Sequence, residues 1–346
     1  MNSVTIQSNS TNHAAVQASK IEAMIKKRSY KRFIPVIFIA VAILFFLNKV
    51  YEKDKRTKYY SSGEIKQEYY VNSEGVADGR LTEYFEGGSI SSLVDFKDGK
   101  QHGWSQFFHK NGTMRKKTYF ENGVQQDTLL TFYNDGDVET AFSIRDGKKH
   151  GNYVYYFENS KKKEEGIYQN DRLEGEVVSY NNRGQVAARG YYDSGDRYAL
   201  IRYSDGEQEY ISFPAGFKVT LPPSFKLDSI SSNTFTSFKN KEAGIFLIMG
   251  ANASSQPLST ELSKQMKEAV GANNLKEVSR EEMMIGDVKA QSVVLLNNDS
   301  NDYLNLFFLK RGDTLINIYF FVPASKMAEY ESSMLDILKS FSFKAA

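Results

Sequence analysis

The sequence contains no cysteine, which excludes disulfide bonds, thiol nucleophiles and thiolate metal sites. The sequence does not indicate an oxidising or a reducing compartment, because a chain without cysteine can fold in either. A dominant charge is also lacking. The 346 residues carry a formal net charge of +2, so the charge balance gives no reason to expect a nucleic-acid partner. The length is sufficient for two domains.

Sequence signatures of catalysis are missing as well. The chain has no HExxH, no Gly-x-Ser-x-Gly, no phosphate-binding loop and no Gly-x-Gly-x-x-Gly after a strand. Helix-favouring patterns are scarce until late in the chain, whereas aromatic residues make up 14% of it, which favours strands. We therefore expect a β-rich protein that is not an enzyme and that needs no cofactor.

The strongest positive feature is a repeat with a period of 24 residues. Aromatic residues recur at this step at Tyr60, Tyr84, Phe108, Phe132, Tyr156 and Tyr180. A second column, half a period away, contains Phe96, Phe120, Ile144, Tyr168 and Tyr192. Self-similarity over about six copies is typical of a repeat architecture.

Each repeat divides into two short aromatic or β-branched runs, each closed by a turn dipeptide such as Asp98-Gly99 or Asn122-Gly123. Glycine, Asn and Asp readily adopt the positive φ that tight hairpins need, so the pattern predicts consecutive antiparallel hairpins over 57–206. Stability must then come from stacking each hairpin on the next. Three positions depart from the pattern, because Asp127, Ser160 and Asp171 stand where glycine is expected.

These segments resemble MORN-type repeats in their bacterial variant. The resemblance rests on Tyr84-Phe85-Glu86-Gly87-Gly88, Phe96-Lys97-Asp98-Gly99-Lys100 and Asp146-Gly147-Lys148-Lys149-His150-Gly151, and it covers somewhat under half of the chain. Similar proteins are often described as antitoxin-like, while other relatives act as scaffolds or were proposed to touch membranes. The resemblance therefore implies binding rather than chemistry.

Two of the four histidines, His102 and His150, occupy the same place two repeats apart. At about 4.8 Å per strand they would lie several strands apart, too far to share one ion. We expect no metal site from them.

After about Gly206 the period disappears, and residues 207–346 predict a mixed domain. Strands are expected from Phe217 onwards, among them Phe217 to Leu221 and Thr314 to Val322, with one helix after Ser259 and a second that carries Met327 near the end of the chain. The order of elements, the opening Phe213-Pro214-Ala215-Gly216-Phe217 and the closing Leu338-Lys339-Ser340-Phe341-Ser342-Phe343 resemble the extrinsic photosystem II lumenal subunits. That resemblance implies an α/β/α sandwich and an assembly or binding role.

Near the amino terminus, Phe33 to Leu47 is an unbroken apolar run of 15 residues between Arg32 and Lys49. At about 1.5 Å per residue the run spans only ~22 Å, but snorkelling basic residues and the flanking Tyr30 and Tyr51 extend it towards a ~30 Å hydrocarbon layer. We expect a transmembrane helix at 33–51, after a flexible tail at 1–32. A cleaved signal peptide and a buried core helix are the alternatives.

A transmembrane helix would make the chain a single-pass protein of the bacterial inner membrane. Basic residues flank the run on both sides, so the positive-inside rule leaves the orientation open. We favour a cytoplasmic amino terminus, which places the following domains in the periplasm. The lipid bilayer would then be a partner through this helix.

Aromatic residues next to the 24-residue column are the candidate binding residues. If the repeat sheet is a single layer, they lie on its open face and offer a protein large contact area at low entropic cost. The alternative is that both faces are covered and these residues are core. The six candidates are Phe85, Trp104, Phe107, Tyr133, Tyr155 and Phe157.

The fold class expected is thus mainly β plus α+β: a single transmembrane helix, an antiparallel hairpin sheet and an α/β/α sandwich. The function expected is protein binding without catalysis, with a toxin, effector or envelope component as the partner. In its sharper form the protein is an antitoxin or immunity protein. An envelope scaffold or lipid-contacting assembly factor is the alternative, motivated by the anchor and the basic stretch Lys53 to Lys58. An enzyme hidden in the carboxy-terminal domain would need a pocket of convergent polar groups.

Overall fold

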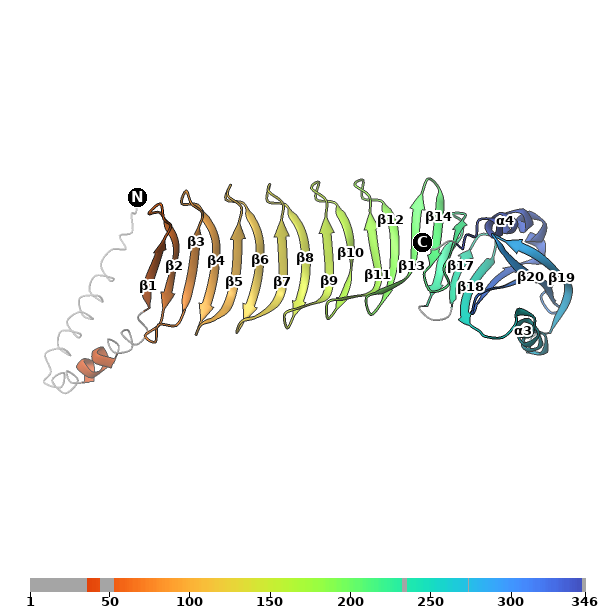
Figure 1. Ribbon diagram of the computed structural model, residues 1–346, viewed down its shortest axis with the longest axis horizontal. Helices are drawn as coiled ribbons and strands as arrows, with labels where there is room; N and C mark the ends of the chain where they lie inside the picture. Colours follow the sequence, from red (N-terminus) through yellow and green to blue (C-terminus); the bar gives the residue numbers. More distant parts are fainter. Residues whose placement is uncertain (1–35, 44–52, 232–234, 273, 344–346) are drawn as a thin grey trace, which may run out of the picture. The chain divides into compact units, whose positions relative to one another are not determined.

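A computed structural model describes residues 36–43, 53–231, 235–272 and 274–343 (Figure 1). A short helix covers 36–43. The elements that follow are β1 (Asp54–Tyr59), β2 (Ile65–Val71), β3 (Gly79–Tyr84), β4 (Ile90–Lys97), β5 (Lys100–Phe108), β6 (Met114–Glu121), β7 (Val124–Phe132), β8 (Val138–Arg145), β9 (Lys148–Tyr156), β10 (Lys162–Gln169), β11 (Arg172–Tyr180), β12 (Val186–Asp193), β13 (Asp196–Ser204), β14 (Glu207–Ser212), β15 (Phe217–Leu221), β16 (Lys226–Ile230), β17 (Phe235–Asn240), β18 (Ile245–Ala253), α3 (Leu258–Ala272), β19 (Leu275–Ile285), β20 (Val288–Asn297), β21 (Tyr303–Arg311), β22 (Thr314–Val322), the 3₁₀ turn η2 (Ala324–Lys326) and α4 (Met327–Lys339).

The chain divides into two compact units, Met1–His102 and Gly103–Ala346. In the first, β1 to β4 pair antiparallel in chain order. In the second, β5 to β15 are also antiparallel, each strand pairing with the next, and we call these strands the repeat sheet. The prediction of consecutive antiparallel hairpins is confirmed.

Tight two-residue turns close one end of the hairpins. Asp146 and Gly147 have φ of 52° and 76°, as the type I′ geometry requires. The N–H of the second turn residue also donates to the preceding hairpin, from Gly147 to the Gln125 carbonyl over 2.8 Å and from Asp171 to the Lys149 carbonyl over 2.9 Å. These two hairpins are therefore each linked to the preceding hairpin by a backbone hydrogen bond.

The three positions without the expected glycine keep the same geometry. Asp127, Ser160 and Asp171 have φ of 64°, 58° and 67°. These values lie in the left-handed region, which costs a residue with a Cβ free energy, although Asp and Asn tolerate it better than most residues. The repeat thus overrides the local preference of three of its own residues.

A second sheet, which we call the C-terminal sheet, has seven antiparallel strands in the order β16-β17-β18-β22-β21-β20-β19. Helix α3 packs Leu262 and Met266 on one face, against residues of β20 and β21 such as Leu295 and Phe308. Helix α4 lies on the opposite face, as Figure 1 shows, where Ile337 and Leu338 join the main core.

The main core joins the two sheets of the second unit. Tyr210, Phe217 and Val219 of the repeat sheet are buried in the same cluster as Phe238 and Leu247 of the C-terminal sheet. The ring of Tyr210 is 5.4 Å from that of Phe238, in edge-to-face geometry. Strands β14 and β15, which follow Gly206, are therefore hydrogen-bonded to the repeat sheet while their side chains complete the core of the C-terminal part.

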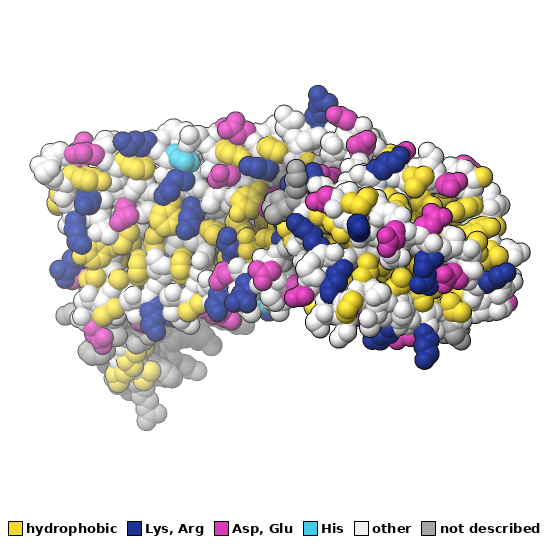
Figure 2. Space-filling view, turned by 45° about the vertical axis from the view of Figure 1, so that its right-hand side comes forward, with side chains coloured by type: hydrophobic (Ala, Val, Ile, Leu, Met, Phe, Trp, Pro, Cys, Tyr) yellow, Lys and Arg dark blue, Asp and Glu magenta, His cyan; other side chains and the backbone are white. Residues whose placement is uncertain are grey.

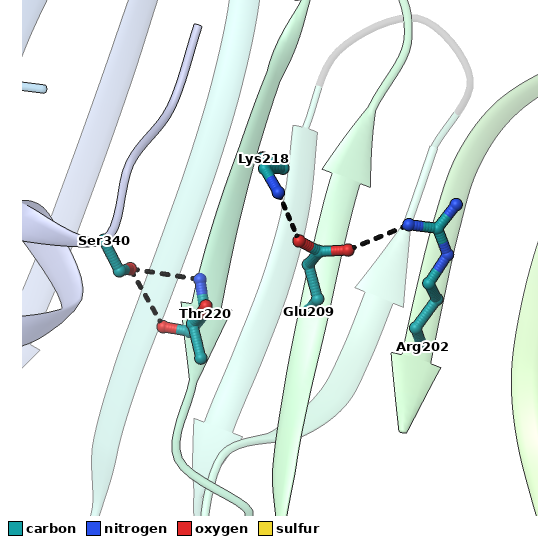
Figure 3. Close-up of polar contacts among 5 residues, drawn as sticks. All are labelled: Arg202, Glu209, Lys218, Thr220 and Ser340. Carbon is teal, nitrogen blue, oxygen red and sulfur yellow. Dashed lines mark hydrogen bonds and ion pairs between the residues drawn. The ribbon is translucent and has the colours of Figure 1, made fainter. Parts of the chain in front are cut away.

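The last described residues run beside β15. Figure 3 shows the Ser340 hydroxyl against Thr220: it accepts from the Thr220 N–H at 3.0 Å and donates to the Thr220 carbonyl at 3.2 Å. Two strands away, Glu209 binds Lys218 at 2.8 Å and Arg202 at 3.1 Å. The Lys218 ammonium is the main reason why the pKa of the Glu209 carboxyl is lowered, and Arg202 adds to the effect.

The predicted membrane helix is not supported. Among the described residues no helix is both long enough and apolar enough to cross a bilayer. The described part of the expected span is the helix at 36–43, which at about 1.5 Å per residue is ~12 Å long against a hydrocarbon layer of ~30 Å. The rest of 33–51 and the expected tail at 1–32 lie outside the described residues. The predicted fold class was wrong in this component. Neither the predicted inner-membrane localisation nor the lipid bilayer as a partner through this helix is supported.

Candidate protein-binding surface

The six candidate residues occupy two kinds of position, and all six are half-buried. Three lie on strands of the repeat sheet: Trp104 and Phe107 on β5, and Tyr155 on β9. The other three directly follow the last residue of a strand and open a turn, because each has an N–H that donates to the carbonyl four residues ahead: Phe85, Tyr133 and Phe157. Phe85 belongs to the first unit of the chain.

Trp104 and Phe107 point to opposite faces of the repeat sheet. They are three residues apart in a stretch of β5 whose pairing with β6 is regular, with Trp104 opposite Tyr119 and Phe107 opposite Lys116. Side chains alternate between faces along a strand, so an odd separation places two residues on different faces. The structure therefore does not bring Trp104 into one patch with Phe107.

Phe107 and Tyr155 do share a face. Direct cross-strand partners connect them across five strands, from Phe107 to Lys116, Thr131, Thr140 and finally Tyr155. Because directly opposite residues in an antiparallel pair lie on the same face, these five side chains form one row across the sheet. We call the face that carries this row the Phe107 face.

The repeat sheet is a single layer along this row. In the part of the chain that the structure describes, extensive contacts of β6 to β11 are made only with neighbouring strands of the sheet, and neither α3 nor α4 packs on them. Aromatic rings on either face are thus shielded mainly by side chains of the same face. Phe107 and Tyr155, the half-buried ends of the row, therefore lie on a face that no other layer covers among the described residues, while Thr140 between them is buried.

Tyr155 also has a structural role. Its ring makes edge-to-face contacts with Phe142 at 5.5 Å and with Tyr153 at 5.6 Å, and Tyr153 packs on Tyr168 at 4.8 Å. The Tyr153 hydroxyl donates to Glu164 at 2.9 Å, and burial raises the pKa of Tyr153. This group is the small core of the middle repeats, so Tyr155 is partly a core residue, whereas Phe107 is not a member of that cluster.

Basic side chains lie next to the strand aromatics. On the Phe107 face the Lys116 ammonium is 5.7 Å from the Phe107 ring centre, and the Arg115 guanidinium approaches the same ring at 6.0 Å. On the other face Lys117 lies 4.2 Å above Trp104. Figure 2 shows hydrophobic side chains interspersed with Lys and Arg side chains on the face turned to the viewer. The sequence-based prediction omitted these cations, although the run Arg115-Lys116-Lys117 inside an aromatic strand was a usable signal.

The described residues hold no group of three or more metal-ligating side chains. The ring nitrogens of His150 lie 3.1 Å from Arg145 Nη1 and 3.3 Å from Asn170 Oδ1. His150 is thus occupied with neighbours of its own hairpin and the next one.

Comparisons with known proteins find distant structural neighbours, which include PsbP-like and other β-rich domains. No family model matches it, and no curated protein matches it. The cyanobacterial PsbP protein of Synechocystis matches 40% of this chain and 94% of its own, at 12% identity and a TM-score of 0.35. A Pseudomonas aeruginosa protein of unknown function matches 39% and 96%, at 14% identity and a TM-score of 0.29. MucB, solved in complex with MucA, matches 87% and 98%, at 13% identity and a TM-score of 0.16. At these values the neighbours assign no function to this chain.

Proposed function

We propose that this protein is a non-enzymatic protein-binding module and that the partner docks on the Phe107 face of the repeat sheet. The observation that supports the proposal is the row from Phe107 to Tyr155 on a sheet that is one layer thick. Half-buried aromatic rings fixed on a rigid sheet lose little conformational entropy on binding, and such rings are enriched among residues that dominate binding energy.

The partner should be a protein with acidic groups around an apolar contact. Arg115 and Lys116 lie beside the Phe107 ring and would face carboxylates of a docked protein. Charges at the rim of an interface raise the association rate and its dependence on salt more than they raise affinity. Binding should therefore slow markedly as ionic strength rises.

The finer form of the proposal follows from the sequence. We propose that the 24-residue units are MORN-type repeats and that the partner is a toxin or effector whose activity is lost in the complex. An activity assay of the captured partner, free and bound, tests this form separately. Retained activity in a stoichiometric complex would leave a binding module that is not an antitoxin.

The experiment is an affinity capture with the full chain as bait, using extract of the native host. Phe107→Ala removes the accessible ring, and Trp104→Ala on the opposite face of the same strand is the matched control. We expect one stoichiometric protein on the unmodified bait and on the Trp104 variant, and its loss with Phe107→Ala. Circular dichroism and thermal unfolding of each variant separate lost binding from lost folding.

A scaffold or lipid-contacting assembly factor is the second candidate function, favoured by the cations beside Phe107 and Trp104. Anionic vesicles would attract Lys116 and Lys117 in a salt-sensitive way. Equal vesicle binding by the unmodified chain and by Phe107→Ala, without any captured protein, would favour this function over the first.

A further inference from the structure

Helix α3 covers only half of its face of the C-terminal sheet. It packs Leu262 and Met266 against β20 and β21. Of the β18 and β22 side chains that point to the same face, Tyr319 packs against this cluster, and two cavities open along the others.

The first cavity is apolar and has a volume of about 650 Å³. Its walls include Phe246 and Ile248 of β18, Leu304 of β21 and Phe321 of β22. The Phe321 side chain is 39% exposed, a large apolar surface left open to solvent. A volume of this size is typical of sites for small molecules.

The second cavity is polar and has a volume of about 660 Å³. It follows the other half of the same two strands, from Asn252 of β18 to Leu315, Asn317 and Tyr319 of β22. Ala269 of α3 lines both cavities. In the ladder of β18 and β22, Phe246 pairs with Phe321 at the apolar end and Asn252 with Leu315 at the polar end, so the two cavities lie end to end along one strand pair, and we call them together the trough.

The polar half contains an unpaired buried group. Asn317 is 5% exposed, and its Oδ1 accepts no hydrogen bond from the residues that the structure describes. A buried acceptor without a donor costs free energy, because it has lost water and gained nothing in return. A ligand that brings an N–H donor to this end of the trough would remove that cost.

The width of the trough is fixed at this end. The Tyr319 hydroxyl donates to Gln265 Oε1 of α3 at 3.0 Å, and the Ser254 hydroxyl donates to Glu261 Oε1 at 2.6 Å. These two bonds join α3 to β22 and to the end of β18. The polar half is therefore preformed, which lowers the entropic cost of binding.

The charged side chains that line the trough indicate the charge of its ligand. The polar half carries two carboxylates, those of Glu261 and Glu268, and a single ammonium, that of Lys264, while Asp302 adds a third carboxylate in the apolar half. We propose that the trough binds a single-chain amphiphile with a cationic, hydrogen-bond-donating head: the chain lies over Phe246, Ile248 and Phe321, and the head donates to Asn317. The volume of the trough fits a small molecule rather than a folded protein.

Calorimetric titration of the full chain with decylammonium, with decanoate as the anionic control of the same chain length, tests the proposal. We expect saturable binding of decylammonium and at least tenfold weaker binding of decanoate. Ile248→Trp, which fills the apolar half, should abolish binding. Equal affinity for the two amphiphiles, or no binding of either, would overturn the proposal.

Asn317→Leu separates a ligand contact from a merely structural role. The substitution keeps the branching and the number of side-chain heavy atoms but removes the unpaired acceptor, so the free protein should unfold at a higher temperature while its affinity for decylammonium falls about fivefold. Unchanged affinity in this variant would refute the role of Asn317 as the head-group acceptor. Binding of a peptide with apolar residues before a lysine, without binding of decylammonium, would likewise overturn the proposed ligand class.

Discussion

Ser342 and Lys218 exchange two backbone hydrogen bonds, each 2.9 Å long. The residues on either side of Ser342, Phe341 and Phe343, are buried and lie 5.2 Å and 6.4 Å from the Phe217 ring. The carboxy-terminal segment thus pairs with β15, the last strand of the repeat sheet. A free strand edge would be a template for aggregation, so the segment protects that end of the sheet.

Replacing Ser340 should loosen this segment. Ser340→Ala removes the acceptor of the Thr220 N–H and leaves that part-buried group unpaired. We expect the free energy of unfolding to fall by about 1–2 kcal/mol, measured by urea denaturation. Lys339→Ala, at an exposed position one residue earlier, is the control and should change it by less than about 0.5 kcal/mol. Equal stability of the two variants would contradict a role for the Ser340 hydroxyl.

Gly166 makes room for the small core of the middle repeats. A Cβ at this position would lie 2.9 Å from Val177 Cγ2 and 3.0 Å from Tyr153 Cε1. Gly166→Ala should therefore lower the free energy of unfolding by about 1–3 kcal/mol, since overpacking forces side chains off their rotamers. Gln169→Ala, at an exposed position of the same strand, serves as the comparison. A neutral or stabilising effect of the Gly166 variant would show that the cluster repacks freely.

The two aspartates with positive φ should respond in opposite ways to glycine. Asp127 has φ of 64° and only a 3.2 Å bond from the neighbouring Thr128 hydroxyl, so Asp127→Gly should stabilise the protein by about 0.5–1 kcal/mol. Asp171 has φ of 67° but also accepts the Lys149 N–H at 2.9 Å. Asp171→Gly loses this bond and should be neutral or destabilising. Thermal unfolding of both variants checks the order, and a reversed order would contradict it.

The pair of cations around Glu209 predicts a dependence of stability on pH. Lys218 and Arg202 lower the folded-state pKa of Glu209 below its reference value of 4.5. Its stabilising contribution is therefore present above pH 4.5 and is lost as the pH falls through the lowered pKa. Glu209→Gln should cost about 0.5–1 kcal/mol at pH 7 and nothing at pH 2. Glu207→Gln, at an exposed position of the same strand, is the control; a penalty for Glu209→Gln that persists at pH 2 would contradict the ion-pair explanation.

Much of the fold could be read from the sequence, because hairpins with glycine turns and alternating apolar strands leave strong local signals. The expected strand from Thr314 to Val322 coincides with β22, and the helix expected near Met327 begins there. The expected strand Phe217 to Leu221 also exists as β15, but it belongs to the repeat sheet. Local pattern shows that a strand forms and not which sheet it joins, since pairing depends on distant residues.

The candidate surface was harder to predict, because a fixed period does not follow strand bulges and strand ends. The N–H of Tyr60 donates to the carbonyl four residues ahead, as the N–H of Phe85 does in the next repeat. These two equivalent turn positions are 25 residues apart, whereas the sequence period is 24. Register shifts at β5 and β6, between Phe107 and Phe108 and again between Thr118 and Tyr119, also break the alternation of faces. Turn and strand aromatics were therefore grouped in one patch, although the structure separates Trp104 from Phe107.

The predicted domain boundaries at residues 33 and 207 remain predictions. The apolar run from Phe33 predicted a membrane helix because of its composition, which the described residues do not support. The turn from Ser204 to Glu207, by contrast, marks the end of the period without ending the sheet, which continues through β14 and β15.

The measurement that tests the central claim most directly is the affinity of the captured partner for three purified forms of the full chain. The account predicts that Trp104→Ala binds like the unmodified protein, while Phe107→Ala binds at least thirtyfold more weakly, which corresponds to the loss of about 2 kcal/mol expected for a central aromatic contact. Equal affinity of the unmodified and Phe107→Ala forms, or a greater loss with Trp104→Ala, would contradict docking on the Phe107 face.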